Sequence, residues 1–128
     1  MADYPAIATF RFPDLAAARD FYVDQLGFTV TRDDQNLSIA FGAAQIMLEG
    51  DESAFYGDLY NRAIAERRGQ RSPNALYIEA PGLDELYQRC LDRQIRVVDS
   101  IGSRPWGQRE FTVEDPAGNF LSFWEREE

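Results

Sequence analysis

The side chains that could do chemistry in this chain are aromatic rings and carboxylates that recur at every second residue. Tyr77 and Glu79 are spaced in this way, and Phe120 and Trp124 lie four residues apart, which is a multiple of the same spacing. A spacing of two places side chains on the same face of a β-strand. Aromatic faces stack on planar heterocycles and attract cations, and a carboxylate can pair with an amine. The pattern therefore indicates a surface for a planar, positively charged small molecule.

The predicted ligand-binding set combines these residues with others at matching positions. All but one lie on predicted strands, on the face that would point away from a covering helix. The exception is Trp106, which lies in a Pro-Trp-Gly loop, where its ring would be at the rim of the surface. Any one of the aromatic side chains could instead fill the core or a subunit contact, so the prediction depends on the whole set. Its members are Arg11, Glu49, Tyr77, Glu79, Trp106, Phe120 and Trp124.

The absence of histidine excludes several kinds of active site. Without histidine there is no Ser-His or Cys-His pair to activate a nucleophile. No glycine-rich phosphate-binding motif occurs either, so a nucleotide site is not indicated. The single cysteine, Cys90, is expected to be a small, buried apolar side chain. We therefore assign no catalytic residue.

The charge balance favours a cationic small molecule over a nucleic acid as the partner. The chain has 13 basic and 22 acidic residues, which give a formal net charge of −9. Nucleic-acid-binding proteins are usually basic, whereas an acidic protein attracts cations. Solubility alone would also account for the negative charge.

No apolar run reaches the roughly 18 residues of a membrane-spanning helix, and a single cysteine suits a reducing compartment. The expected location is cytoplasmic, with no membrane or nucleic-acid partner.

The pattern of apolar residues predicts one α+β domain over residues 1–128, built from two similar halves. Each half would contain a strand, a helix and three further strands, at about residues 5–49 and 74–125. Asp14 is placed to cap the first helix and Gly27 to end it. The connecting residues 50–73 are either a short helix or a solvated linker. Strands are predicted at 6–12, 28–32, 37–41, 45–49, 75–80, 95–99, 108–114 and 120–125, and helices at 15–25 and 83–93.

Three stretches of the chain carry a family resemblance. They are FPDLAAARDFYVDQLGF, APGLDELYQRCLDRQI and the C-terminal SRPWGQREFTVEDPAGNFLSFWE, with its PWG loop and DPxGN turn. Together they resemble bleomycin resistance proteins, within the glyoxalase/vicinal-oxygen-chelate superfamily. The resemblance implies two βαβββ modules around a pseudo-symmetric crevice, usually in a homodimer. In that family the drug is sequestered at the dimer interface and is not chemically altered.

The resemblance also bears on metal binding. Most of the superfamily holds a divalent metal with side chains from the first and last strands of each half. The equivalent positions here are Ile7, Met47 or Glu49, Ala75 and Ser122. Glu49 carries the one credible ligand group among them, and a single carboxylate does not define a site for zinc or iron. We therefore expect no metal and no other cofactor.

The leading hypothesis is a non-catalytic binding protein that sequesters a cationic aromatic small molecule, as in antibiotic resistance. The alternative is an enzyme of the same superfamily, either dioxygenase-like or a metal-independent lyase or isomerase. In the lyase or isomerase, Glu49 or Glu79 would act as the base and Tyr77 or Arg11 as the electrophile. A third hypothesis is an interaction or storage protein whose crevice is closed by packing.

Overall fold

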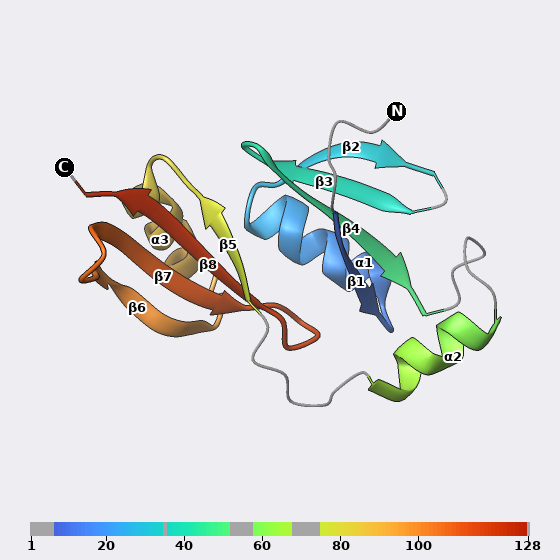
Figure 1. Cartoon of the computed structure of the whole chain (residues 1–128). Coiled ribbons are helices and arrows are strands. Elements are labelled where there is room, and N and C mark those ends of the chain that lie inside the picture. Colours follow the sequence, from blue (N-terminus) through green and yellow to red (C-terminus); the bar gives the residue numbers. More distant parts are fainter. Residues whose placement is uncertain (1–6, 35, 52–57, 68–74, 128) are drawn as a thin grey trace.

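The chain folds into two four-stranded sheets, each with a helix on one face (Figure 1). The computed structural model describes residues 7–34, 36–51, 58–67 and 75–127. The first unit consists of β1 (Ala8–Phe12), α1 (Leu15–Arg19), the π-helix η1 (Asp20–Gln25), β2 (Thr29–Asp33), β3 (Leu37–Phe41) and β4 (Ala44–Gly50). The second unit consists of β5 (Ala75–Glu79), α3 (Leu83–Asp92), β6 (Val97–Ser103), β7 (Gln108–Glu114) and β8 (Phe120–Arg126).

The connection between the units contains a helix, α2 (Asp58–Arg67). This agrees with the helical alternative for residues 50–73, although residues 52–57 and 68–74 lie outside the described residues. None of the described helices is long and apolar enough to cross a membrane.

Both sheets have the same strand order, which gives the two units the same topology. The orders are β1-β4-β3-β2 and β5-β8-β7-β6. β1 pairs in parallel with β4, and β5 pairs in parallel with β8, while the remaining pairs are antiparallel. A parallel pair needs a crossover connection, and in each unit that crossover begins with a helix. The predicted α+β fold with two βαβββ units is confirmed.

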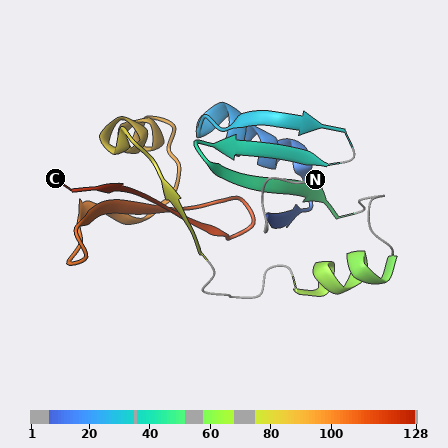
Figure 2. The same ribbon diagram turned by 45° about the horizontal axis from the view of Figure 1, so that its top comes forward.

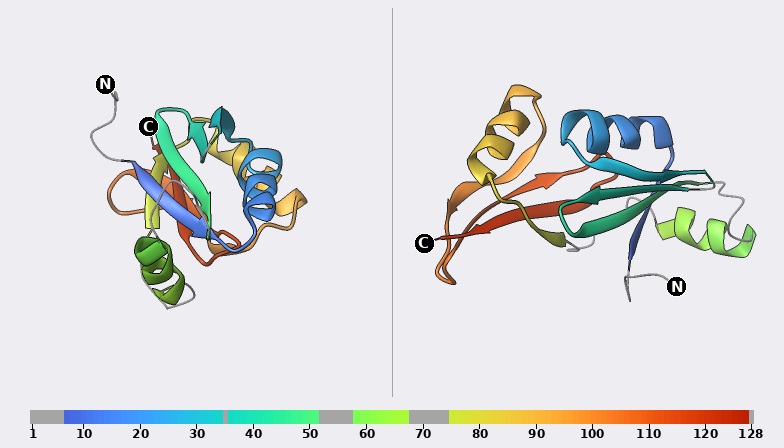
Figure 3. Two further views of the ribbon diagram at one scale, coloured as in Figure 1. Left: turned by 90° about the vertical axis from the view of Figure 1, so that its right-hand side faces the viewer. Right: turned by 90° about the horizontal axis from the view of Figure 1, so that it is seen from above.

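The helices of the two units lie on the same side of the sheets. Figure 2 shows α1 against the first sheet and α3 against the second, and the right-hand view of Figure 3 shows α2 on the other side. Apolar side chains beneath α1 and α3 form one core across both units, which includes Ile39, Leu48, Phe111 and Phe123. One face of each sheet is therefore used for the core, and the opposite face is left for other contacts.

The first helix differs from the prediction of one regular helix over residues 15–25. Five residues of α-helix in α1 are followed by the π-helix η1. The amide of Leu26 donates to the carbonyl of Phe21 at 2.9 Å, which is the wider i→i−5 bond. Phe21 and Tyr22 are consecutive, yet both are buried. The wider turn changes the direction of the side chains around it, and both rings lie in the core.

The ends of most elements agree with their local sequence signals. Asp14 caps α1 by accepting a hydrogen bond from the amide of Ala17 at 3.2 Å, and Gly27 follows η1 with a φ of 92°. The exception is β6, which was predicted at 95–99 and occurs at Val97–Ser103. The pairing of β6 with β7 shifts register on both sides of Asp99. Such irregularities carry the strand through a Ser-Ile-Gly-Ser stretch that β-propensity does not favour.

Buried contacts join the two units. The hydroxyl of Tyr22 in η1 donates to Asp115, 2.7 Å away, in the turn between β7 and β8. The ring centroids of Phe41 and Phe123 lie 5.4 Å apart. With their neighbours, these rings form a continuous series of aromatic contacts that runs from the first unit into the second. The two units therefore share one interior.

Two arginines, Arg89 in α3 and Arg93 immediately after it, also reach the first unit, where they bind the last carbonyl groups of η1. Arg89 Nε donates to the carbonyl of Gln25 at 2.8 Å, and Arg93 donates to the carbonyl of Asp24. The final carbonyls of a helix lack partners within the helix and carry partial negative charge, so guanidinium groups stabilise them. The contact between the units thus has a polar, exposed part beside its buried part.

Stability is expected to fall in alkaline solution, because two buried groups keep their protons in the folded state. Burial, with the neighbouring Asp115 carboxylate, raises the pKa of the Tyr22 hydroxyl well above its usual value. Burial also raises the pKa of the Cys90 thiol to about 11. The unfolded chain loses these protons near their ordinary pKa values, so the free energy of unfolding decreases as the pH rises above about 9.

Thermal unfolding between about pH 8 and 11 measures this effect. The decrease in unfolding temperature should be smaller for Tyr22→Phe and for Cys90→Ala than for the wild type. Tyr77→Phe makes the same chemical change at an exposed tyrosine and is the matched control. A double variant, Tyr22→Phe with Cys90→Ala, whose unfolding temperature falls as steeply as that of the wild type would contradict the prediction.

Candidate functional site

The face of the second sheet opposite α3, here called the open face, carries most of the predicted ligand-binding residues. Strand register arranges them in rows across β5, β8 and β7. The first row, here called the acid–indole row, contains Glu79, Trp124 and Glu110. The next row contains Tyr77, Ser122 and Thr112.

The aromatic rings on the open face differ from the rings of the core in their exposure. Tyr77 is 62% exposed, and Trp106, in the turn between β6 and β7, is 60% exposed. Glu79 is exposed, while Phe120 and Trp124 are half-buried. Large exposed aromatic side chains that gather on one face often mark contact with another molecule. The open face therefore brings together the predicted stacking surface and a carboxylate.

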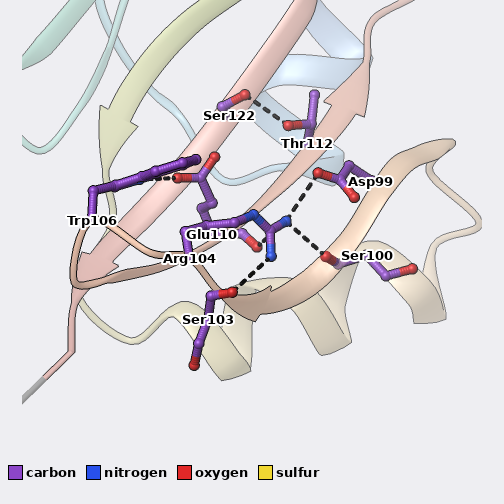
Figure 4. Close-up of polar contacts among 8 residues, drawn as sticks. All are labelled: Asp99, Ser100, Ser103, Arg104, Trp106, Glu110, Thr112 and Ser122. Atoms are coloured by element: carbon purple, nitrogen blue, oxygen red, sulfur yellow. Dashed lines mark hydrogen bonds and ion pairs between the residues drawn. The ribbon is translucent and has the colours of Figure 1, made fainter.

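Trp106 is held by Glu110, a residue outside the predicted set. The indole Nε1 donates to Oε1 of Glu110 at 3.0 Å, and Figure 4 shows the two groups pointing toward one another. The carboxylate is buried even though the ring above it is exposed. Alternation along the predicted strand 108–114 could have identified Glu110, because it places that residue on the same face as Trp124.

Two hydroxyl groups form a buried pair in the row beside Glu110. The oxygen atoms of Thr112 and Ser122 lie 2.7 Å apart (Figure 4). A hydroxyl can donate once and accept twice, so each member of the pair has capacity for a further hydrogen bond. The centre of the open face is therefore polar and uncharged, with aromatic rings around it.

The first sheet places the other two predicted residues, Arg11 and Glu49, side by side on the face opposite α1. They are register partners on β1 and β4, and Arg11 Nη2 lies 3.4 Å from Glu49 Oε2. Their side chains are 5% and 0% exposed. Asn36 Nδ2 lies 3.5 Å from the other carboxylate oxygen of Glu49, and Arg11 donates to the carbonyl of Asp51. These charges therefore neutralise each other in a buried ion pair, whereas the predicted residues of the second sheet are accessible.

The residues at the positions of the superfamily's metal ligands do not fit a divalent ion. Ile7, Met47 and Ala75 carry no carboxylate or imidazole, Ser122 belongs to the hydroxyl pair, and Glu49 belongs to the ion pair. Across residues 7–34, 36–51, 58–67 and 75–127, no three His, Cys, Asp or Glu side chains form a group that could hold a metal. Zinc and iron sites require several such donors. The donor set for the superfamily's metal chemistry is therefore incomplete at these positions.

The chain matches a family model over almost its whole length. The model is that of the Glyoxalase/Bleomycin resistance protein/Dioxygenase superfamily, and the match covers residues 6–123. No curated protein sequence matches the chain.

Several solved structures have the same fold. TioX from Micromonospora sp. ML1 is 16% identical with a TM-score of 0.72, and the match covers 94% of this chain and 98% of that chain. A superfamily member from Sphaerobacter thermophilus DSM 20745 is 22% identical with a TM-score of 0.68, over 96% and 98% of the two chains. A glyoxalase/bleomycin resistance protein/dioxygenase from Alicyclobacillus acidocaldarius is 20% identical with a TM-score of 0.67, over 97% and 92%. At these identities the likeness shows the fold and assigns no ligand.

Proposed function

The chain belongs to the Glyoxalase/Bleomycin resistance protein/Dioxygenase superfamily, and within it we propose a non-catalytic binding protein for a cationic aromatic small molecule of the bleomycin type. The ligand is sequestered and released chemically unchanged. The proposal includes a homodimer, because the resemblance to bleomycin resistance proteins implies one.

The observation that carries this proposal is the exposure of aromatic rings beside a carboxylate on the open face. Tyr77 and Trp106 present large exposed surfaces on which a planar ligand can stack. Trp124 lies next to Glu79 in the register, so a cation over the indole also meets a carboxylate. The formal net charge of −9 adds long-range attraction for such a ligand.

The composition of the chain supports binding without catalysis. The chain contains no histidine, and Glu49, one of the two carboxylates predicted as a base for an enzyme, is paired with Arg11. Stacking and charge attraction need no reacting group. The accessible chemistry of the open face is therefore sufficient for sequestration.

Glu79→Gln is expected to weaken the binding of metal-free bleomycin about three- to fivefold and to reduce the salt dependence of its affinity. Glu79 is exposed, so the loss of its charge should act on the ligand and leave the fold intact. Calorimetric titrations at two salt concentrations measure the affinity. A thermal shift provides a second readout, since a ligand that binds the native state raises the unfolding temperature.

Glu85→Gln is the matched control, because it removes the same charge from an exposed position on α3, on the other side of the sheet. Equal affinity and salt dependence for the wild type and Glu79→Gln would contradict the role of Glu79.

The absence of a saturable thermal shift with either metal-free or copper-loaded bleomycin would exclude bleomycin as the ligand. Turnover of a small carbonyl substrate in the presence of a chelator would favour the enzyme instead, and sedimentation velocity tests the homodimer.

A further inference from the structure

The open face contains a buried carboxylate that accepts a hydrogen bond from an exposed indole ring. Glu110 is 4% exposed, whereas the Trp106 ring that donates to it is 60% exposed. A carboxylate is transferred out of water favourably only when it is well paired, and a large ring is stable when it is buried. In this arrangement the carboxylate has a neutral donor and the ring remains in water, so neither group has its preferred environment.

The Glu110 carboxylate can accept more than the indole supplies. An ionised carboxylate has two oxygens with about four acceptor sites. Within the described part of the chain, the indole N–H of Trp106 is the donor to this carboxylate, and no ion pair involves it. Arg104 lies in the same turn, but its guanidinium group is bound to Asp99 at 2.9 Å and to backbone carbonyls (Figure 4). A charged N–H donor forms a stronger hydrogen bond to a carboxylate than a neutral donor does. A cationic ligand that replaced the indole would therefore form the stronger hydrogen bond to Glu110.

The neighbours of Glu110 complete a site for such a cation. Trp124 lies beside it in the register, and Glu79 lies on the far side of Trp124. Adjacent strands are about 4.8 Å apart, so the two acidic residues stand about 10 Å apart across the indole. A cation over Trp124 is therefore attracted by the ring face and by a carboxylate on each side. The Thr112–Ser122 pair in the next row offers hydroxyl groups to polar atoms of the same ligand.

We propose that Glu110 is the anchor for a protonated amine or amidine of the ligand, and that Trp106 is a lid over this anchor. The indole N–H binds the carboxylate in the free protein, and the N–H groups of the ligand replace it. The released indole then stacks on the planar part of the ligand. This inference rests on the proposed function and narrows its ligand to an aromatic cation that carries N–H donors. A quaternary ammonium has the charge but no such donor, so it does not displace the lid.

Two probes with the same ring and the same charge, one with N–H donors and one without, test the anchor on the wild-type protein. They are 2-naphthylmethylammonium and its N,N,N-trimethyl analogue. The primary ammonium is expected to bind about tenfold more tightly, as measured by calorimetry. It should also move the indole ¹H–¹⁵N resonance of Trp106 upfield as that hydrogen bond is lost, whereas the trimethyl probe should not. Trp106→Phe assigns the resonance.

Glu110→Gln keeps the size of the side chain, removes its charge and is expected to bring the affinity ratio of the two probes to about one. Glu85→Gln, on the other side of the sheet, should keep the ratio of the wild type. Equal affinity of both probes for the wild type, or an indole resonance that does not move, overturns the anchor but leaves the proposed function standing. Binding of neither probe at several millimolar overturns both. The resonance is measured on the wild type, so a folding defect in Glu110→Gln does not affect that outcome.

Discussion

Glu49→Ala is expected to lower the free energy of unfolding by about 3–5 kcal/mol. The side chains of Glu49 and Arg11 are 0% and 5% exposed, so the variant removes a carboxylate that lies 3.4 Å from a buried guanidinium group. Loss of one member of a buried pair is severe because the remaining charge keeps its desolvation penalty. Urea denaturation followed by circular dichroism measures the change, and an unchanged slope m indicates that the same fold unfolds.

Two comparisons separate the effect of burial from that of charge. Asp33→Ala removes the acid from the Arg19–Asp33 pair, which is close at 2.7 Å but exposed on both sides, and should cost less than about 1 kcal/mol. The double variant Arg11→Met with Glu49→Leu removes both buried charges and should recover most of the stability. If Glu49→Ala is as stable as the wild type but loses affinity for bleomycin, Glu49 is a ligand contact, as the sequence predicts.

Asp115→Ala is expected to lower the free energy of unfolding by about 3–4 kcal/mol, and Tyr22→Phe by about 1–2 kcal/mol. Asp115 accepts hydrogen bonds from the Tyr22 hydroxyl at 2.7 Å and from the amides of Ala117 and Asn119 at 2.9 and 2.8 Å. The alanine variant leaves the buried hydroxyl without this acceptor and removes the bonds that shape the turn. The phenylalanine variant removes the hydroxyl together with its need for a partner. Urea denaturation of both variants measures the difference.

Asp115→Asn is the matched control, because it keeps an acceptor oxygen for the two amides and removes the charge that faces Tyr22. Its stability should lie between those of the wild type and Asp115→Ala. Tyr22 and Asp115 belong to different units, so a double-mutant cycle of Tyr22→Phe and Asp115→Ala measures the coupling between the units. A coupling energy near zero would contradict the direct contact.

Much of the fold could be predicted because its signals are local. Alternation identified the strands, and Asp14 and Gly27 marked the ends of the first helix. Gly118 has a φ of 89° in the turn that the Asp-Pro-Ala-Gly-Asn run predicts. The π-helix could not be predicted in this way, because the apolar pattern of residues 15–25 also fits a regular α-helix.

For the candidate site, the sequence predicts which side chains share a face but not which of them stay accessible. Alternation treats Glu49 and Glu79 alike, yet Glu49 is paired with Arg11 through the register of β1 with β4, while Glu79 is exposed. Glu110 lies outside the predicted set, although strand alternation places it on the same face as Trp124. Its hydrogen bond with the Trp106 indole is a contact that strand periodicity does not encode.

The aromatic contacts that cross from one unit to the other lie on the helix side of the sheets, as the pairing of Phe41 with Phe123 shows. On β8 the interior residues alternate with the side chains of the open face. Phe123 is therefore buried in the interior, while Trp124, the next residue, is half-buried on the open face. A substitution of Phe123 changes the interior that the two units share, whereas a substitution of Trp124 changes the open face. In evolutionary terms, the shared interior can be conserved while the outward surface changes to fit a new small molecule.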